Sequence, residues 1–208
     1  MLSDGLDAAT RALVTLAAAV AVGREPLIEE QSRAAVAADV PAVWIDELLL
    51  QSVLMVGWPR ALVAAGIWRR ASGARAPAAD PSLTEDSEQW RRRGEATCAV
   101  VYGTNYSRLR ENVRALHPAL DAWMIVEGYG RVLSRPALDL GRRELCVIAQ
   151  TAVLGTPRQL HSHLRGALHA GVGEDVVEES LAMVSADLDP SHRELAQATW
   201  ARVRKREE

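Results

Sequence analysis

The sequence predicts an all-α protein. Apolar residues recur at helical spacing along the chain, no stretch shows sustained period-two alternation, and the 208 residues include no Phe and only three Tyr. Alanine, leucine and valine must therefore fill the core, and such small side chains suit close helix packing better than a β-sandwich. The length allows one large domain or two small ones.

An internal repeat organises the chain. Aligning Arg11 with Arg143 gives an offset of 132 residues, and without any gap this offset pairs identical residues at many further positions. These pairs are Ala17 and Ala149, Gly23 and Gly155, Arg33 and Arg165, Ala35 and Ala167, Ala38 and Ala170, Val40 and Val172, Glu47 and Glu179, and Leu49 and Leu181. Because one pair consists of turn glycines, chance similarity between two alanine-rich helices does not explain the match. We therefore expect two copies of one module.

Three helices are predicted in the first copy. The apolar stretch 13–22 predicts a core helix, because about ten residues are too few to cross a bilayer. Gly23 and Pro26 mark the boundary to the second helix. Asp39 and Pro41 mark the next boundary, with Asp in place of a helix-ending glycine.

The middle of the chain predicts a linker followed by two helices. Residues 72–87 are rich in Ala, Pro, Gly, Ser and Asp, which is typical of a linker or an exposed loop. Residues 90–102 and 106–131 have apolar positions at helical spacing, with predicted breaks near Gly103 and at 128–130.

The second copy predicts three helices with stronger boundary signals. Asp139 is a suitable N-cap for a helix that Gly155 ends. Pro157 suits the first turn of the next helix, which Gly171 ends. Residues 173–175 begin a third helix with acidic side chains in its first turn.

We therefore divide the chain into three parts. Residues 1–71 form a degenerate, partial module, residues 72–87 a linker, and residues 88–208 a more complete module.

Charge and cysteine content restrict the partners and the compartment. A net charge of −3 gives no basic footprint, so we expect no nucleic-acid partner. Cys98 and Cys146 lie far apart and form no C-x-x-C, which does not fit a secreted disulfide framework. We expect a cytoplasmic protein that binds no membrane.

A series of ordered motifs covers roughly residues 88 to 186. It comprises Trp90-Arg91-Arg92-Arg93-Gly94, Gly128-Tyr129-Gly130, Ser134-Arg135-Pro136-Ala137-Leu138-Asp139, Arg143-Glu144-Leu145, Ala149, Leu154-Gly155, Leu160, His163, Arg165, Ala167-Leu168, Gly171-Val172 and Glu178-Glu179. This series resembles the module of the carboxymuconolactone decarboxylase family, within the alkylhydroperoxidase D-like superfamily. The resemblance implies the helical fold of that family.

The first copy resembles the same family over about residues 11 to 68. It keeps Gly57-Trp58-Pro59, which is similar to the family's G-x-P after its last helix. The second copy has Asp189-Pro190-Ser191 at that place and lacks this element.

The resemblance points to Glu144 and His163 as the catalytic residues. In the first copy the corresponding positions hold Ala12 and Gln31, so we expect the second copy to carry any chemistry. An antiparallel hairpin about Gly155 would place the acid and the histidine within roughly 4–5 Å along the helix axes, so the two can flank one small cavity. The sequence leaves open that Glu144 instead binds a neighbouring arginine and that His163 is a satisfied interface histidine.

Further residues are predicted at the substrate. Arg135 and Arg143 are candidates for clamping a carboxylate, because a guanidinium forms bidentate hydrogen bonds. Glu127 is a candidate for the pocket wall. His161 and His163 do not suit a shared metal, because residues two apart on a helix point to nearly opposite sides. We expect no metal and no cofactor.

The resemblance implies a cofactor-free acid–base lyase that acts on a small carboxylated lactone or a related organic acid. One alternative is a redox role of the peroxiredoxin or alkylhydroperoxidase type. The reactive cysteines of that chemistry would fall on Thr156 and Gln159, so both thiols are missing. A second alternative is a non-enzymatic helical assembly protein, and the sequence leaves open whether the chain turns over a substrate.

The resemblance also implies self-association. Single-module members of the family form rings of six, so a tandem chain is expected to close as a homotrimer or to stack further into a hexamer.

Overall fold

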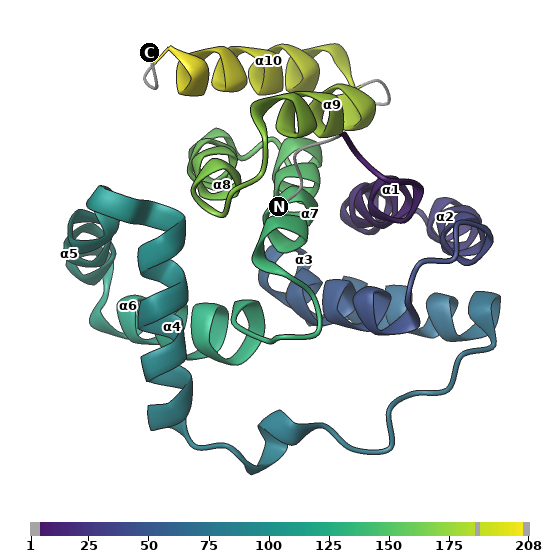
Figure 1. The fold of residues 1–208 in the computed structure, drawn as a ribbon, viewed down its shortest axis with the longest axis horizontal. Coiled ribbons are helices and arrows are strands. Elements are labelled where there is room, and N and C mark those ends of the chain that lie inside the picture. Colours follow the sequence, from purple (N-terminus) through teal and green to yellow (C-terminus); the bar gives the residue numbers. More distant parts are fainter. Residues whose placement is uncertain (1–4, 186–187, 206–208) are drawn as a thin grey trace.

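The computed structural model describes residues 5–185 and 188–205, which form helices without any β-strand (Figure 1). The predicted all-α fold is confirmed. The helices are α1 (Ala8–Val22), α2 (Glu25–Ala37), α3 (Ala42–Ser72), α4 (Ser87–Tyr102), α5 (Tyr106–Leu116), α6 (Pro118–Trp123), α7 (Leu140–Val153), α8 (Pro157–His169), α9 (Glu174–Ser185) and α10 (Pro190–Arg204). Two short 3₁₀-helices, η1 (Pro81–Thr84) and η2 (Gly103–Asn105), and a π-helix, η3 (Met124–Leu133), complete the described elements.

The helix boundaries recur at the offset found in the sequence. Helices α1, α2 and α3 begin 132 residues before α7, α8 and α9, and α2 and α8 also end at corresponding residues. Helix α3 is interrupted at Gly57, whose φ of 74° is not helical, and the part after Gly57 corresponds to α10. The second copy therefore lacks the G-x-P sequence but keeps the helix that follows it, so the repeat is longer than the predicted three helices.

Capping side chains and glycines with positive φ lie at the helix ends that the sequence predicts. The Asp139 carboxylate accepts a hydrogen bond from the Arg142 backbone N–H (3.0 Å) and caps α7. Gly155 and Gly171 follow α7 and α8 with positive φ. Asp39, at the position of Gly171 in the first copy, has a φ of 52° and is the only non-glycine residue with positive φ in the described chain. Aspartate tolerates this region better than most residues, which explains the substitution.

Each copy supplies the ion-pair partner of the other. Arg143 in the second copy binds Glu47 in the first (Nη2–Oε2, 2.6 Å), and Arg11 in the first copy binds Glu179 in the second. At the repeat offset, Arg11 corresponds to Arg143 and Glu47 to Glu179. The same contact is therefore made in both directions, as across the interface of a symmetric dimer.

The two copies share one hydrophobic core. Figure 1 shows α7 at the centre, in contact with α1 and α3 of the first copy and with α8, α9 and α10 of the second. Buried side chains between residues 6 and 68 and between 138 and 203 form one cluster. The predicted division into 1–71, 72–87 and 88–208 thus describes a repeat rather than two separate cores. Residues 1, 186 and 208, at which predicted segments begin or end, lie outside the described residues.

The segment predicted as one helix over 106–131 is divided differently. It breaks at His117, which is extended (φ −168°, ψ 132°) because the residue before a proline disfavours helical geometry. No break occurs at 128–130, where the π-helix η3 continues. The prediction of a break there was wrong.

The glycines in this region serve close packing between helices. A Cβ on Gly130 would overlap the Trp90 carbonyl oxygen of α4, and a Cβ on Gly94 would overlap the Ile125 carbonyl oxygen of η3. Helices α4 and η3 can therefore approach backbone to backbone only because both positions lack a side chain. Beside this crossing lies a second, smaller hydrophobic cluster that includes Cys98 and Tyr129.

Helix α3 combines core residues with an apolar outer side. By length and composition alone it could cross a membrane, since it contains an 18-residue window with a mean hydropathy of 1.5. Ile45, Leu48 and Trp68 are nevertheless buried in the shared core, and Glu47 is buried beside Arg143. A core helix of a soluble protein passes the same test of composition.

Candidate active site

The structure brings the two predicted catalytic residues into contact. Glu144 on α7 and His163 on α8 face each other across the hairpin that Gly155 turns, with 2.8 Å between His163 Nδ1 and Glu144 Oε2. The sequence had left open that Glu144 binds an arginine, and in the described structure its partner is the imidazole. When the carboxylate is ionised it can only accept, so Nδ1 donates and Nε2 is left to exchange a proton.

The two side chains differ in access to solvent. Glu144 is 0% exposed, whereas His163 is 6% exposed. The imidazole is therefore the more accessible member of the pair, although both side chains are buried. Glu144 lies behind it and holds its orientation.

A glycine makes room for the carboxylate. A Cβ on Gly166 of α8 would lie 2.6 Å from Glu144 Oε2 and 2.7 Å from Val101 Cγ1. Any larger residue would displace Glu144 or push α4 away from α8. Gly166 lies one turn after His163, but no motif in the sequence points to it.

Two buried or half-buried tyrosines lie near the pair. Tyr102 of α4 and Tyr129 of η3 form an edge-to-face pair with 6.3 Å between ring centroids. Burial raises the pKa of Tyr129 well above its ordinary value and raises that of Tyr102 as well, and the Glu144 charge adds to both effects. Glu144 Oε1 is buried and has no hydrogen-bond partner among the described residues. The carboxylate therefore keeps an unused acceptor where the dielectric is low.

Neither cysteine is suited to thiol chemistry. Cys98 and Cys146 are free and buried, and burial raises the pKa of each thiol to about 12. Near neutral pH almost no nucleophilic thiolate forms at such a pKa. The missing C-x-x-C is therefore not replaced by these two residues.

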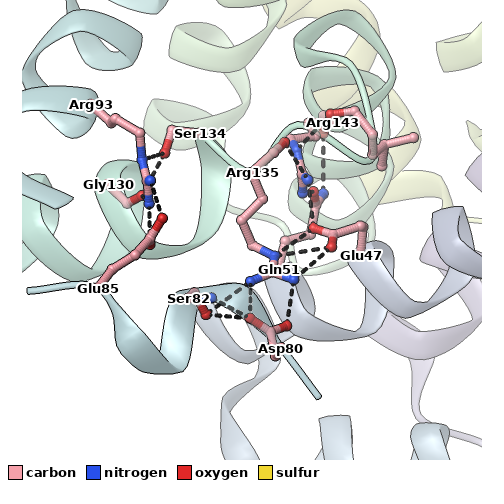
Figure 2. Close-up of polar contacts among 11 residues, drawn as sticks. Glu47, Gln51, Asp80, Ser82, Glu85, Arg93, Gly130, Ser134, Arg135 and Arg143 are labelled. Atoms are coloured by element: carbon pink, nitrogen blue, oxygen red, sulfur yellow. Dashed lines mark hydrogen bonds and ion pairs between the residues drawn. The ribbon is translucent and has the colours of Figure 1, made fainter. Parts of the chain in front are cut away.

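The predicted carboxylate clamp lies in a different network (Figure 2). Arg143 donates to Glu47 and to the Leu138 carbonyl, and Arg135 donates to Glu47 (2.8 Å) and to Asp80 (2.7 Å). These bonds tie α7 to α3, and they tie the segment before α7 to α3 and to the linker. Since both guanidinium groups already bind carboxylates of the chain, the arrangement favours a structural role over the predicted binding of substrate.

The predicted wall residue is also elsewhere. Glu127 is about half exposed and forms an ion pair with Arg131 one turn further along η3 (3.3 Å). The structure does not bring it to the pair of Glu144 and His163. The neighbouring Tyr129 contributes to these surroundings instead, and the Gly128-Tyr129-Gly130 motif was the sequence signal for it.

The segments that build this geometry match a known family. The model of the carboxymuconolactone decarboxylase family matches residues 1–70 and 118–203, which together make up about three quarters of the chain. The chain belongs to the carboxymuconolactone decarboxylase family. The predicted resemblance is confirmed, although the second matched segment begins at residue 118 rather than at 88. Residues 71–117, including α4 and α5, lie outside the matched segments.

One relative within this family is a named enzyme. The 4-carboxymuconolactone decarboxylase of Acinetobacter baylyi is 28% identical over 94 residues, which cover 45% of this chain and 70% of that protein.

Proposed function

We propose that the chain is a cofactor-free acid–base lyase that removes CO₂ from a small carboxylated lactone or a related organic acid. The observation that carries this proposal is the buried contact between His163 and Glu144. The membership of the carboxymuconolactone decarboxylase family and the similarity to a decarboxylase support the same reaction class.

The chemistry requires one proton transfer. When the bond to the departing carboxylate breaks, its electron pair stays on the substrate carbon and delocalises into the unsaturated lactone as an extended enolate. His163 in its protonated form donates a proton from Nε2 to that carbon and later recovers one from solvent. Glu144 accepts the Nδ1 hydrogen throughout and stabilises the imidazolium, so it acts as a positioning residue.

The test is turnover of γ-carboxymuconolactone, followed by its ultraviolet absorbance. We expect the parent chain to consume it and His163→Ala to lose about 10²–10⁴-fold in rate, the usual contribution of a general acid or base. Glu144→Ala should lose at least about tenfold, equivalent to about 1.4 kcal/mol of transition-state stabilisation.

The first copy provides a matched control. Gln31 occupies the position of His163 at the repeat offset, so Gln31→Ala should leave the rate unchanged. No turnover by the parent would remove the decarboxylase proposal. Turnover that both variants of the pair leave intact would discard this site.

We also propose that the chain self-associates through α3, as a homotrimer or a hexamer. The outer side of this helix exposes apolar side chains at Val43, Leu50, Leu54, Trp58 and Leu62. Such a continuous apolar side is typical of a surface that is covered by another copy. Light scattering should therefore give a mass above that of the monomer, and Trp58→Asp should lower it. A parent chain that scatters as a monomer would contradict the proposal.

This apolar side is also the observation that favours the non-enzymatic alternative. An assembly protein would keep the oligomer and show no turnover, whereas the lyase proposal requires both the fold and the pair of Glu144 and His163.

A further inference from the structure

A cavity bordered by α8 lies near the catalytic pair but contains neither Glu144 nor His163 in its lining. It has a volume of about 290 Å³ and lies between α4, η2, α5 and α8. Its lining residues are Val101, Tyr102, Asn105, Arg108, Leu109, Asn112, His161, Ser162, Arg165 and His169. The volume is at the small end for a ligand site and suits a metabolite rather than a nucleotide or a polymer.

The cavity lining carries positive but no negative side chains among the described residues. Of the described residues that line it, none carries a carboxylate, whereas Arg108 and Arg165 both contribute guanidinium groups. The chain as a whole has a net charge of −3, so this concentration of positive charge is local.

The two arginines also lack partners within the described chain. Nearby, Arg110 and Arg114 share the Asp121 carboxylate, but no described carboxylate pairs with Arg108 or Arg165. Arg165 Nε is buried and has no hydrogen-bond acceptor among the described residues. A buried donor without an acceptor is costly, and an anion in the cavity would provide the missing acceptor.

We propose that this cavity binds a small oxyanion with two negative charges, either a dicarboxylate or a phosphate-bearing metabolite. Arg165 binds its oxygen atoms from α8 and Arg108 binds them from α5. The Asn105 and Asn112 amides and the Ser162 hydroxyl offer further hydrogen bonds, and Val101 and Leu109 contact its apolar part.

The pair of Glu144 and His163 is not part of this site, although Tyr102 contributes both to the cavity lining and to the surroundings of the pair. Neither of these residues lines the cavity, and His163 and Arg165, two positions apart on a helix, point to different sides. More than half of the lining comes from residues 101–112, which lie outside the segments matched by the family model. The rest of the lining comes from α8, which lies inside the second matched segment.

The experiment is isothermal titration calorimetry of the full chain with sodium phosphate, succinate and phthalate at constant ionic strength. Succinamide is the uncharged control. We expect saturable binding of at least one dianion and none of succinamide. The phosphate arm and the dicarboxylate arms show which oxyanion the site prefers.

Substitutions test the location. Arg165→Gln should weaken binding at least about tenfold, since a charge-assisted bidentate contact is lost. Arg108→Gln, on the exposed side of α5, provides a second variant should Arg165→Gln alter the fold, which circular dichroism would reveal. Arg158→Gln removes an exposed charge from the same helix outside the cavity and should leave affinity unchanged.

Three results would overturn the proposal. The first is the absence of saturable binding of all three anions by the folded parent. The second is an equal loss in Arg158→Gln and Arg165→Gln, which would indicate attraction by net charge alone. The third is loss of binding in His163→Ala, which would place the anion at the catalytic pair instead.

Discussion

Glu47→Gln is expected to destabilise the protein by about 3–5 kcal/mol, the usual effect of removing one partner from a buried ion pair. The Glu47 side chain is 3% exposed and that of Arg143 is 0% exposed. The substitution keeps the shape of the side chain and creates no cavity. Its cost therefore arises from the Arg143 guanidinium, which stays buried without a countercharge.

The repeat supplies a matched comparison. Glu179 occupies the position of Glu47 in the second copy and pairs with Arg11, but these side chains are 32% and 46% exposed. Because solvent screens an exposed pair, Glu179→Gln should cost only about 0–1 kcal/mol. The two variants change the same contact between the copies, but Glu47 also binds Arg135, so their difference reports burial together with the loss of this second pair.

The measurement is urea unfolding followed by circular dichroism at one protomer concentration, because self-association would add to stability. In thermal unfolding, the same cost of 3–5 kcal/mol would appear as a decrease of about 6–20 °C in Tm for a chain of this length. Equal costs for the two variants, or a cost below about 1 kcal/mol for Glu47→Gln, would refute the reasoning from burial.

Three further predictions concern packing, thiols and pH. Gly130→Ala should cost about 3 kcal/mol in urea unfolding because its Cβ would overlap backbone atoms of α4, whereas Gly128→Ala, with no close neighbour, should be tolerated; equal effects would contradict the close approach of the helices. Cys98 and Cys146 should resist a thiol reagent at pH 8 in the folded protein and react in guanidinium chloride, since burial raises their pKa to about 12; rapid modification of folded protein would be inconsistent with their burial. Hydrogen bonding by Arg93 lowers the pKa of Glu85 from 4.5 to about 2. This carboxylate therefore stabilises the fold above pH 4.5 and loses its contribution as the pH falls toward 2. The difference in stability between parent and Glu85→Gln should therefore shrink from pH 7 to pH 2.5, and a constant difference would argue against this ion pair.

Helix boundaries that depend on neighbouring residues could be predicted from the sequence. Asp139 caps α7, and Pro157 begins α8, because each acts within one helical turn of its own position. That Glu144 and His163 lie near each other could also be predicted, since one short turn separates their helices, whereas their direct contact could not.

Features that depend on distant residues could not be predicted. With only its neighbours considered, Gly130 predicts a helix break. Its function in the structure is to let the backbone of α4, some forty positions earlier, approach η3 closely. Arg143 is suitable for binding a substrate carboxylate until its partner Glu47, 96 positions away, is placed. The repeat pairs Arg11 with Arg143 and Glu47 with Glu179. The offset alone does not show that the arginine of each copy binds the glutamate of the other.

The most direct test of the proposed chemistry is a double-mutant cycle on decarboxylation of γ-carboxymuconolactone. It compares the rate of the parent with those of His163→Ala, Glu144→Ala and the double variant. If Glu144 acts only through His163, the double variant should be no more than about threefold slower than His163→Ala, because residues that act as a unit are not additive. Losses that multiply in the double variant would show two independent roles and contradict the account.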